Sequence, residues 1–261
     1  MNYFLKGSFS LAFLLAVSCS FAQKRDTLTI TPNNLNKKGI HFGDLTYVVY
    51  TKKTKQSPSE GIYLAKINVA PKDHNNKQAI AITQQWDRGD TVGHSAFTLL
   101  DAADLSTLFH ETYWKRLGYS TVYDFETKKV YFNGNVTDSA KTASINDFNG
   151  SFSSYNLNWH SDLVIFTLLP FKENRSFKIH LFDPGFGKAT DEIYSVTGSD
   201  VLTTATGNKI DCWILENTPA AAKGGYQRFW VDKKNTVILK EEDFFNNNYR
   251  YKLKLEVSEN N

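Results

Sequence analysis

Short runs of β-branched and aromatic residues, separated by polar turns, recur along the chain and constrain its fold most strongly. Residues 45–50, 62–69, 78–86 and 177–182 are such runs, and residues 249–257 alternate over nine positions with Tyr249, Tyr251, Leu253, Leu255 and Val257 on one side. Side chains of a strand point to opposite faces in turn, so alternation predicts one packed and one solvated face. The pattern therefore predicts a meandering antiparallel sheet.

Two pairs of runs are joined by short polar loops. Residues 126–129 separate 120–125 from 130–132, and residues 232–236 separate 229–231 from 237–239. Both arrangements predict β-hairpins. Residues 101–114 allow two interpretations: Leu105, Leu108, Phe109 and Thr112 have helical spacing, but a turn at 101–104 followed by a strand suits the neighbouring strands better.

One apolar helix is predicted at residues 162–169. Ser161 or Asp162 caps its start, and Pro170 ends it, because proline disfavours helix in the residue before it. So short a helix is unstable alone in water. We therefore expect it to dock on an apolar surface, and the inner face of a curved sheet provides one.

The first 22 residues read as a signal peptide. Lys6 supplies the positive charge, residues 9–17 are apolar apart from Ser10, and Ser20 and Ala22 fit a small-residue cleavage site before Gln23. The alternative is lipid attachment at Cys19, although Ala16 fits a lipobox poorly. Residues 23–44 form a polar N-terminal lead-in, residues 45–257 a single antiparallel β domain and residues 258–261 a tail.

Charge and cysteine content exclude several classes of protein. The formal net charge is +3, and no run of five like charges occurs, so we expect no nucleic-acid partner. Residues 23–261 contain no apolar stretch of 18 residues, so we expect no transmembrane segment in the mature chain. After cleavage only Cys212 remains, and its strand-like surroundings predict a buried thiol rather than a reactive one.

Catalytic and metal-binding motifs are not evident. No two of the six histidines lie within five residues of each other, which excludes H-E-x-x-H, and no G-x-S-x-G elbow occurs. Residues 183–188 lack the spacing of a phosphate-binding loop and read as an ordinary loop. The acidic run at residues 241–243 is expected to be solvated. We therefore expect no catalytic residue, no metal, no cofactor and no enzyme activity.

Aromatic residues are the remaining signal. Five tryptophans persist in the mature chain among many Phe and Tyr residues. Aromatic side chains either fill a core or line an apolar site. Trp114, Trp159 and Phe166 are the candidate ligand-binding residues, because their segments are expected to meet the concave side of the sheet.

Four segments carry a resemblance to a known group of proteins. Residues 159–184, 194–200, 209–213 and 228–234, the last reading Arg-Phe-Trp-Val-Asp-Lys-Lys, resemble exported bacterial domains of unknown function related to the lipoprotein carriers LolA and LolB. The resemblance implies a mainly β fold: a strongly curved antiparallel sheet, or half-open β-barrel, wrapped around one or two short helices. In the carriers that concavity holds acyl chains.

These observations together predict an exported, non-enzymatic binding protein of the bacterial envelope, located in the periplasm or at the outer membrane. The expected ligand is a lipid or acyl-type molecule held in the concave face. One alternative is a structural or interaction protein whose partner is another envelope protein. A hydrolase with a dispersed site is the third.

Overall fold

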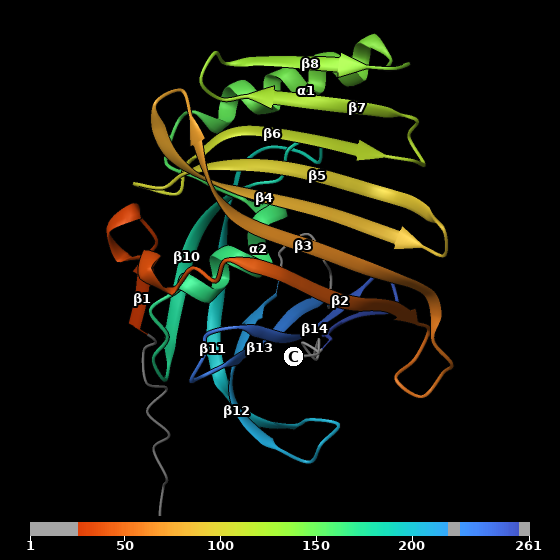
Figure 1. Cartoon of the computed structure of the whole chain (residues 1–261), viewed down its shortest axis with the longest axis vertical. Coiled ribbons are helices and arrows are strands. Elements are labelled where there is room, and N and C mark those ends of the chain that lie inside the picture. Colours follow the sequence, from red (N-terminus) through yellow and green to blue (C-terminus); the bar gives the residue numbers. More distant parts are fainter. Residues whose placement is uncertain (1–25, 219–224, 256–261) are drawn as a thin grey trace, which may run out of the picture.

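The computed structural model describes residues 26–218 and 225–255, and every strand in it belongs to one sheet (Figure 1). The strands are β1 (Asp26–Thr29), β2 (Gly43–Lys52), β3 (Glu60–His74), β4 (Lys77–Arg88), β5 (Thr91–Asp101), β6 (Thr107–Trp114), β7 (Tyr119–Asp124), β8 (Lys129–Asn133), β9 (Leu157–Asn158), β10 (Arg175–Phe182), β11 (Thr190–Thr203), β12 (Lys209–Asn217), β13 (Tyr226–Asp232), β14 (Ile238–Phe245) and β15 (Asn248–Lys254). The helical segments are α1 (Asp138–Ser151), α2 (Asp162–Ile165) and the 3-10 turns η1 (Pro32–Asn34), η2 (Lys37–Gly39), η3 (Trp159–Ser161) and η4 (Phe166–Leu168). None of these helices is long and apolar enough to cross a membrane.

Two antiparallel meanders make up the sheet. The first runs from β2 to β8 and the second from β10 to β15, and β15 pairs with β2 to join them. The two short strands β1 and β9 both pair with β10 in parallel. The sheet curves strongly but does not close, because β1 and β8 end the strand order at opposite edges. This is the mainly β, half-open architecture that the sequence predicts.

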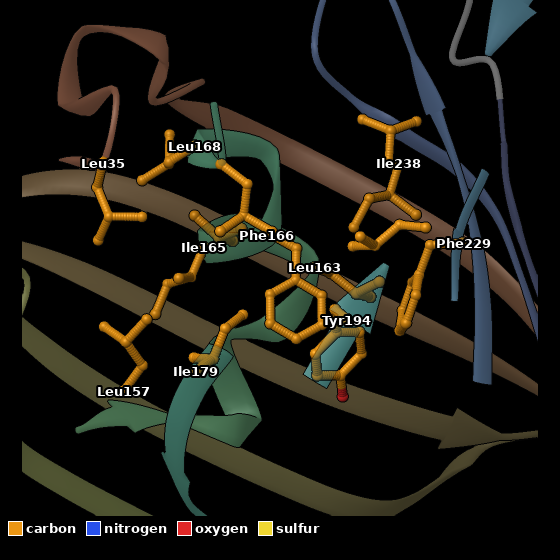
Figure 2. Packing of buried hydrophobic residues seen from close by; sticks show 14 of the residues in the cluster. Leu35, Leu157, Leu163, Ile165, Phe166, Leu168, Ile179, Tyr194, Phe229 and Ile238 are labelled. Carbon is orange, nitrogen blue, oxygen red and sulfur yellow. The ribbon is translucent and has the colours of Figure 1, made fainter. Parts of the chain in front are cut away.

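The segment linking the two meanders fills the concave face of the sheet (Figure 1). The predicted helix at 162–169 forms as α2 followed by η4, and all seven of its residues from Asp162 to Leu168 are buried. Phe166 is fully buried, with ring centroids 4.6 Å from Tyr194 and 5.4 Å from Phe229 (Figure 2). Residues 162–168 therefore pack against the concave face of the sheet, as their apolar composition requires, and we call them the plug.

Turn chemistry explains two of the tight hairpins. Asn75 and Asn76 between β3 and β4, and Asn246 and Asn247 between β14 and β15, have φ between 48° and 63°. Asparagine tolerates this left-handed region better than most residues and favours two-residue hairpin turns. The hairpins predicted at 126–129 and 232–236 are confirmed, and residues 101–114 form a turn followed by strand β6.

Helix α1 was not predicted from the sequence. It is rich in Ser, Asn and Asp, and only Phe148 and Ser151 are buried, so it has no apolar stripe. Its first turn is capped by Thr137, whose hydroxyl accepts a hydrogen bond from the N–H of Ala140 at 3.3 Å. The Phe148 ring packs on Tyr123, Phe125 and Phe182, which anchors the helix beside β7.

Part of the polar lead-in at 23–44 packs onto the sheet. Strand β1 lies at the edge beside β10, and Ile30 and Leu35 are buried in the main core. The N–H of Asn36 donates to the carbonyl of Leu168 at 2.8 Å, which links the lead-in to the plug. The signal peptide, Cys19 and the tail lie outside the described residues.

The acidic run at residues 241–243 is buried, which corrects the expectation that it is solvated. Glu241 and Asp243 share the concave face of the sheet with Arg250 and Lys252 of β15. Lys252 Nζ lies 2.6 Å from Glu241 Oε2, and Arg250 Nε donates to Asp243 Oδ2 at 2.7 Å. Adjacent carboxylates remain buried here because cations of the neighbouring strand balance them.

Cys212 is fully buried in β12, as predicted. It packs with Ile214 and Trp230 in a small cluster on the sheet face opposite the plug. Burial raises the pKa of the thiol to about 11, which keeps it protonated and unreactive.

Candidate functional site: an aromatic pocket beside helix α1

A cavity of about 210 Å³ lies on the concave side of the sheet between strands β6 to β8, helix α1 and the loop after β10. Its walls are formed by Thr112, Trp114, Leu117, Tyr119, Thr121, Tyr123, Phe132, Val136, Ala140, Ala143, Ser144, Asp147, Pro184, Gly185 and Phe186. Three strands, one helix and one loop converge on it. Such convergence of separate elements is typical of binding sites.

Aromatic rings dominate the walls of the pocket. Five of the lining residues are Trp, Tyr or Phe, and Trp114 and Phe186 meet edge to face with ring centroids 5.6 Å apart. Phe186 lies at the mouth with 49% of its surface exposed. A pocket with such walls offers a ligand large apolar surfaces of fixed shape.

Polar atoms contribute nearly half of the pocket wall. The hydroxyl groups of Tyr123 and Ser144 hydrogen-bond each other at 2.7 Å. Among the described residues, Trp114 Nε1 and Thr112 Oγ1 are buried and have no hydrogen-bond partner. Buried polar groups are usually paired, so these two retain hydrogen-bonding capacity.

Gly185 allows the loop to approach the sheet closely. Its φ is +89°, a conformation that disfavours a side chain, and a Cβ there would lie 3.1 Å from the Tyr123 hydroxyl. Residues 183–188, expected to be an ordinary loop, therefore form part of the pocket wall and place Phe186 beside the pocket.

A layer of three histidines backs the pocket. The His94 ring stacks on Trp114 with centroids 3.7 Å apart, and the rings of His94 and His110 lie 5.7 Å and 4.7 Å from His160. His160 Nε2 is 3.2 Å from Asp183 Oδ1. In the described part of the chain, no group of His, Cys, Asp or Glu is arranged to hold a metal ion. Of the three rings, His94 is the one that stacks on Trp114.

Burial holds His94 and His110 neutral. Burial and the nearby His160 together lower the pKa of His94 to about 4. The pKa of His110 is also well below its ordinary value for the same two reasons. A histidine with a lowered pKa in the folded state takes up a proton more readily in the unfolded state. Stability contributed by these residues is therefore lost as the pH falls from about 6.5 towards 4.

The variant His110→Gln tests this layer. Between pH 7 and pH 5 the wild-type unfolding free energy should fall more steeply than that of the variant, by up to about 1.4 kcal/mol per pH unit for one titrating group. Urea denaturation at both pH values measures the difference. At pH 7 the difference in unfolding free energy between the two proteins reports the loss of packing alone. An unfolding free energy that changes equally with pH in both proteins would contradict the prediction.

The structure does not bring the three candidate ligand-binding residues together. Trp114 lines the pocket, Trp159 lies at the start of η3 against the edge of the main core, and Phe166 is inside that core. The role of Trp159 and Phe166 as lining residues stays a prediction. The described cavity beside Trp114 is lined by neither.

Sequence reasoning missed most of the pocket. Tyr119, Tyr123 and Phe132 belong to runs recognised as strands, but their common face depends on the pairing of β6, β7 and β8. Asp147 and Ser144 lie on α1, which was not predicted. Phe186, which follows the Pro184-Gly185 turn, was the one local signal that this loop places an aromatic ring at the pocket.

A second depression, of about 380 Å³, lies at the β14–β15 turn. It is wider and more open, and it is lined by Lys53, Thr54, Lys55, Gln56, Phe244, Asn247 and Tyr249. Both lysines already have partners: Lys53 donates to Asn248 at 2.9 Å and Lys55 to Glu242 at 2.9 Å. The smaller pocket is the better candidate because it is more enclosed and retains unpaired polar atoms.

The fold and the pocket define a half-barrel β domain with an aromatic pocket on its concave side. The model of the family described as "Protein of unknown function (DUF3108)" matches residues 46–254, so the chain belongs to this family. The family match confirms the sequence-based assignment to domains of unknown function.

Two solved structures are similar to the chain. A β-barrel-like protein of the domain of unknown function DUF1849 from Brucella abortus is 8% identical, with a TM-score of 0.41 over 82% of this chain and 95% of that one. A putative outer membrane lipoprotein-sorting protein domain from Vibrio parahaemolyticus is 11% identical, with a TM-score of 0.25 over 85% of this chain and 87% of that one. None of the curated proteins compared with the chain matches it.

Proposed function

We propose that this protein is an exported, non-enzymatic binding protein that holds a small ligand of acyl-type, apolar surface in the pocket beside α1. The observation that carries the proposal is the pocket itself: an enclosed aromatic cavity on the concave face, with Trp114 in its wall. The concave face is also where the resemblance to lipoprotein carriers predicts an apolar ligand.

The volume of the pocket limits the ligand. One water molecule takes about 30 Å³ of liquid, so a cavity of about 210 Å³ has room for about seven non-hydrogen atoms. A long acyl chain exceeds that space. The pocket therefore suits a short alkyl ligand, or one end of a longer molecule that leaves past Phe186.

The proposal includes export, which rests on the signal peptide. N-terminal sequencing of the protein from its own host should find Gln23 as the first residue. Acylated Cys19 instead would place the protein on a membrane surface and overturn the cleavage at Ala22.

Titration with unbranched alcohols from butanol to decanol tests the pocket. Each buried methylene contributes about 0.8 kcal/mol, so the affinity should rise about fourfold per carbon and then level off near seven non-hydrogen atoms. Calorimetry or tryptophan fluorescence reports the binding. Absence of saturable binding across the series would remove the pocket as a ligand site.

A matched pair of helix variants separates the pocket from the protein surface. Ala143→Phe places a ring in the cavity and should abolish binding of hexanol, whereas Thr142→Phe, on the neighbouring exposed position of α1, should leave it unchanged. Both proteins should unfold at nearly the wild-type denaturant concentration. Equal loss of binding in the two variants would contradict the assignment.

One observation favours the alternative of an interaction protein of the envelope. Strand β8 ends the sheet, so one side of its backbone pairs with no other strand among the described residues. An open strand edge is a template for pairing with another chain. If the alcohol series shows no binding, this interaction function becomes the better supported of the two.

A further inference from the structure

The charges around the pocket indicate what kind of ligand it selects. Among the described residues that line it, Asp147 is the only charged one, and no Lys, Arg or His side chain is among them. The pocket thus offers one negative charge and aromatic side chains, of which Trp114 is already stacked on His94 with ring centroids 3.7 Å apart. This combination, together with the proposed function of the same pocket, limits the chemistry of the ligand.

We infer that the buried part of the ligand is a small organic cation of the N-alkylammonium class. The inference rests on the proposed binding function and adds the sign of the ligand's charge. Aromatic faces carry negative electrostatic potential and attract ammonium groups, most strongly when water is excluded. The alkyl groups on such a nitrogen also supply the apolar surface that the walls of the pocket require.

A carboxylate fits the same pocket poorly. Taking an anion out of water requires donors or a cation to replace its hydration. Trp114 Nε1 and the Thr112 hydroxyl are available donors, but Asp147 repels the charge and no lining side chain is cationic. A fatty-acid head group would therefore stay outside.

The local field around Tyr123 is negative. The pKa of Tyr123 is raised to about 12, mainly by burial and to a lesser extent by Tyr119 and the carboxylates of Asp183 and Asp147, while the hydrogen bond with Ser144 opposes them. Asp183 lies 3.2 Å from His160 Nε2 and does not line the pocket, so Asp147 is the carboxylate that favours a cation entering beside Tyr123.

Trp114 is already next to a cation at the protein surface. The guanidinium carbon of Arg116 lies 5.2 Å from the centroid of the Trp114 ring. Arg116 is exposed and does not line the pocket. Its positive charge opposes a cationic ligand, so removing it should strengthen binding of a cation and weaken binding of an anion.

The size of the pocket matches this class. Choline has about seven non-hydrogen atoms, which is the capacity inferred from the cavity volume of about 210 Å³. A neutral compound of the same shape exists, 3,3-dimethylbutan-1-ol, in which carbon replaces nitrogen. The related carboxylate, 3,3-dimethylbutanoate, supplies the opposite charge.

The experiment is calorimetric titration of the full chain with these three compounds. Choline should bind about tenfold more tightly than the neutral alcohol, the factor expected for a cation–π contribution in a partly desolvated site. The carboxylate should bind more weakly than the alcohol. Equal or tighter binding of the alcohol or the carboxylate overturns the inference and leaves the proposed function intact, whereas no binding of any of the three overturns both.

Two charge variants give a signature that a structural effect would not produce. Asp147→Asn should weaken choline binding several-fold and Arg116→Gln should strengthen it, while the neutral alcohol should bind both variants as it binds the wild type. Parallel changes for choline and the alcohol would show that the variants altered packing instead of charge, and would contradict the inference.

Phe132 and Tyr131 are adjacent in β8, so variants of the two form a matched test of the contribution of aromatic rings to binding. Phe132→Leu removes a ring from the pocket while keeping apolar volume, and should reduce the preference for choline over the alcohol. Tyr131→Leu, at a 50% exposed position on the other face of the strand, should leave that preference unchanged. An unchanged preference in Phe132→Leu would count against the aromatic contribution.

Discussion

Phe166→Ala is expected to lower the unfolding free energy by about 3–5 kcal/mol, because truncating a buried aromatic side chain removes its burial and leaves a cavity. Phe166 is fully buried, between Tyr194 and Phe229, at the point where the plug meets the second meander (Figure 2). Both meanders pack on that plug, so little relaxation can fill the space. Urea denaturation followed by circular dichroism gives the value.

Phe186→Ala is the control for this prediction. Its ring is 49% exposed at the mouth of the pocket, so truncation should cost less than about 1 kcal/mol. A loss below about 1 kcal/mol in Phe166→Ala as well would mean that the plug contributes little to the core.

Lys252→Met is the second variant with a large expected effect. Lys252 is 5% exposed on the concave face, among Glu241, Asp243 and Asp162. Removing one partner of a buried ion pair leaves an uncompensated charge, which typically costs 3–5 kcal/mol. We expect a loss of about that size at pH 9, where the Glu241 carboxyl is ionised, whereas Lys254→Met, at a less buried position of the same strand, should cost less than about 1 kcal/mol.

The pH dependence of the stability of Glu241→Gln tests whether the Glu241 carboxyl is protonated in the folded protein. Burial and the neighbouring Asp243 carboxylate raise the pKa of Glu241 to about 8, against the opposing effect of Lys252. A carboxyl with a raised pKa in the folded state favours folding at low pH and loses that contribution as the pH rises through about 8. Wild-type stability relative to Glu241→Gln should therefore fall by about 1.4 kcal/mol per pH unit between about pH 5 and pH 8. A constant difference over that range would show that Glu241 is ionised throughout.

Alternation predicted most of the strands, although not β1 or β5, and it did not predict the inner face of every strand. In β15, Tyr249 and Tyr251 share one face and Arg250 and Lys252 the other, as the pattern shows. An apolar face is the usual choice for a core, yet here the cationic face is inside, because β14 supplies buried carboxylates at the paired positions. Only the register between two strands reveals this.

The candidate site was predictable only in part, for the same reason. Trp114 could be selected because aromatic residues line apolar sites, and the plug helix because its apolar residues need a partner. Helix α1 has a polar sequence without an apolar stripe, so nothing local marks Ser144 or Asp147 as pocket residues. The pocket depends on contacts between segments more than 50 residues apart, such as Trp114 and Phe186.

The pairing of β15 with β2 also sets the order in which this fold can be completed. Lys252 lies opposite Val49, so the two meanders join only through the last strand of the domain. Until that strand has been synthesised, β2 keeps an unpaired edge and the concave core remains open to water. Such long-range closure slows folding and prolongs the time during which strand edges are exposed.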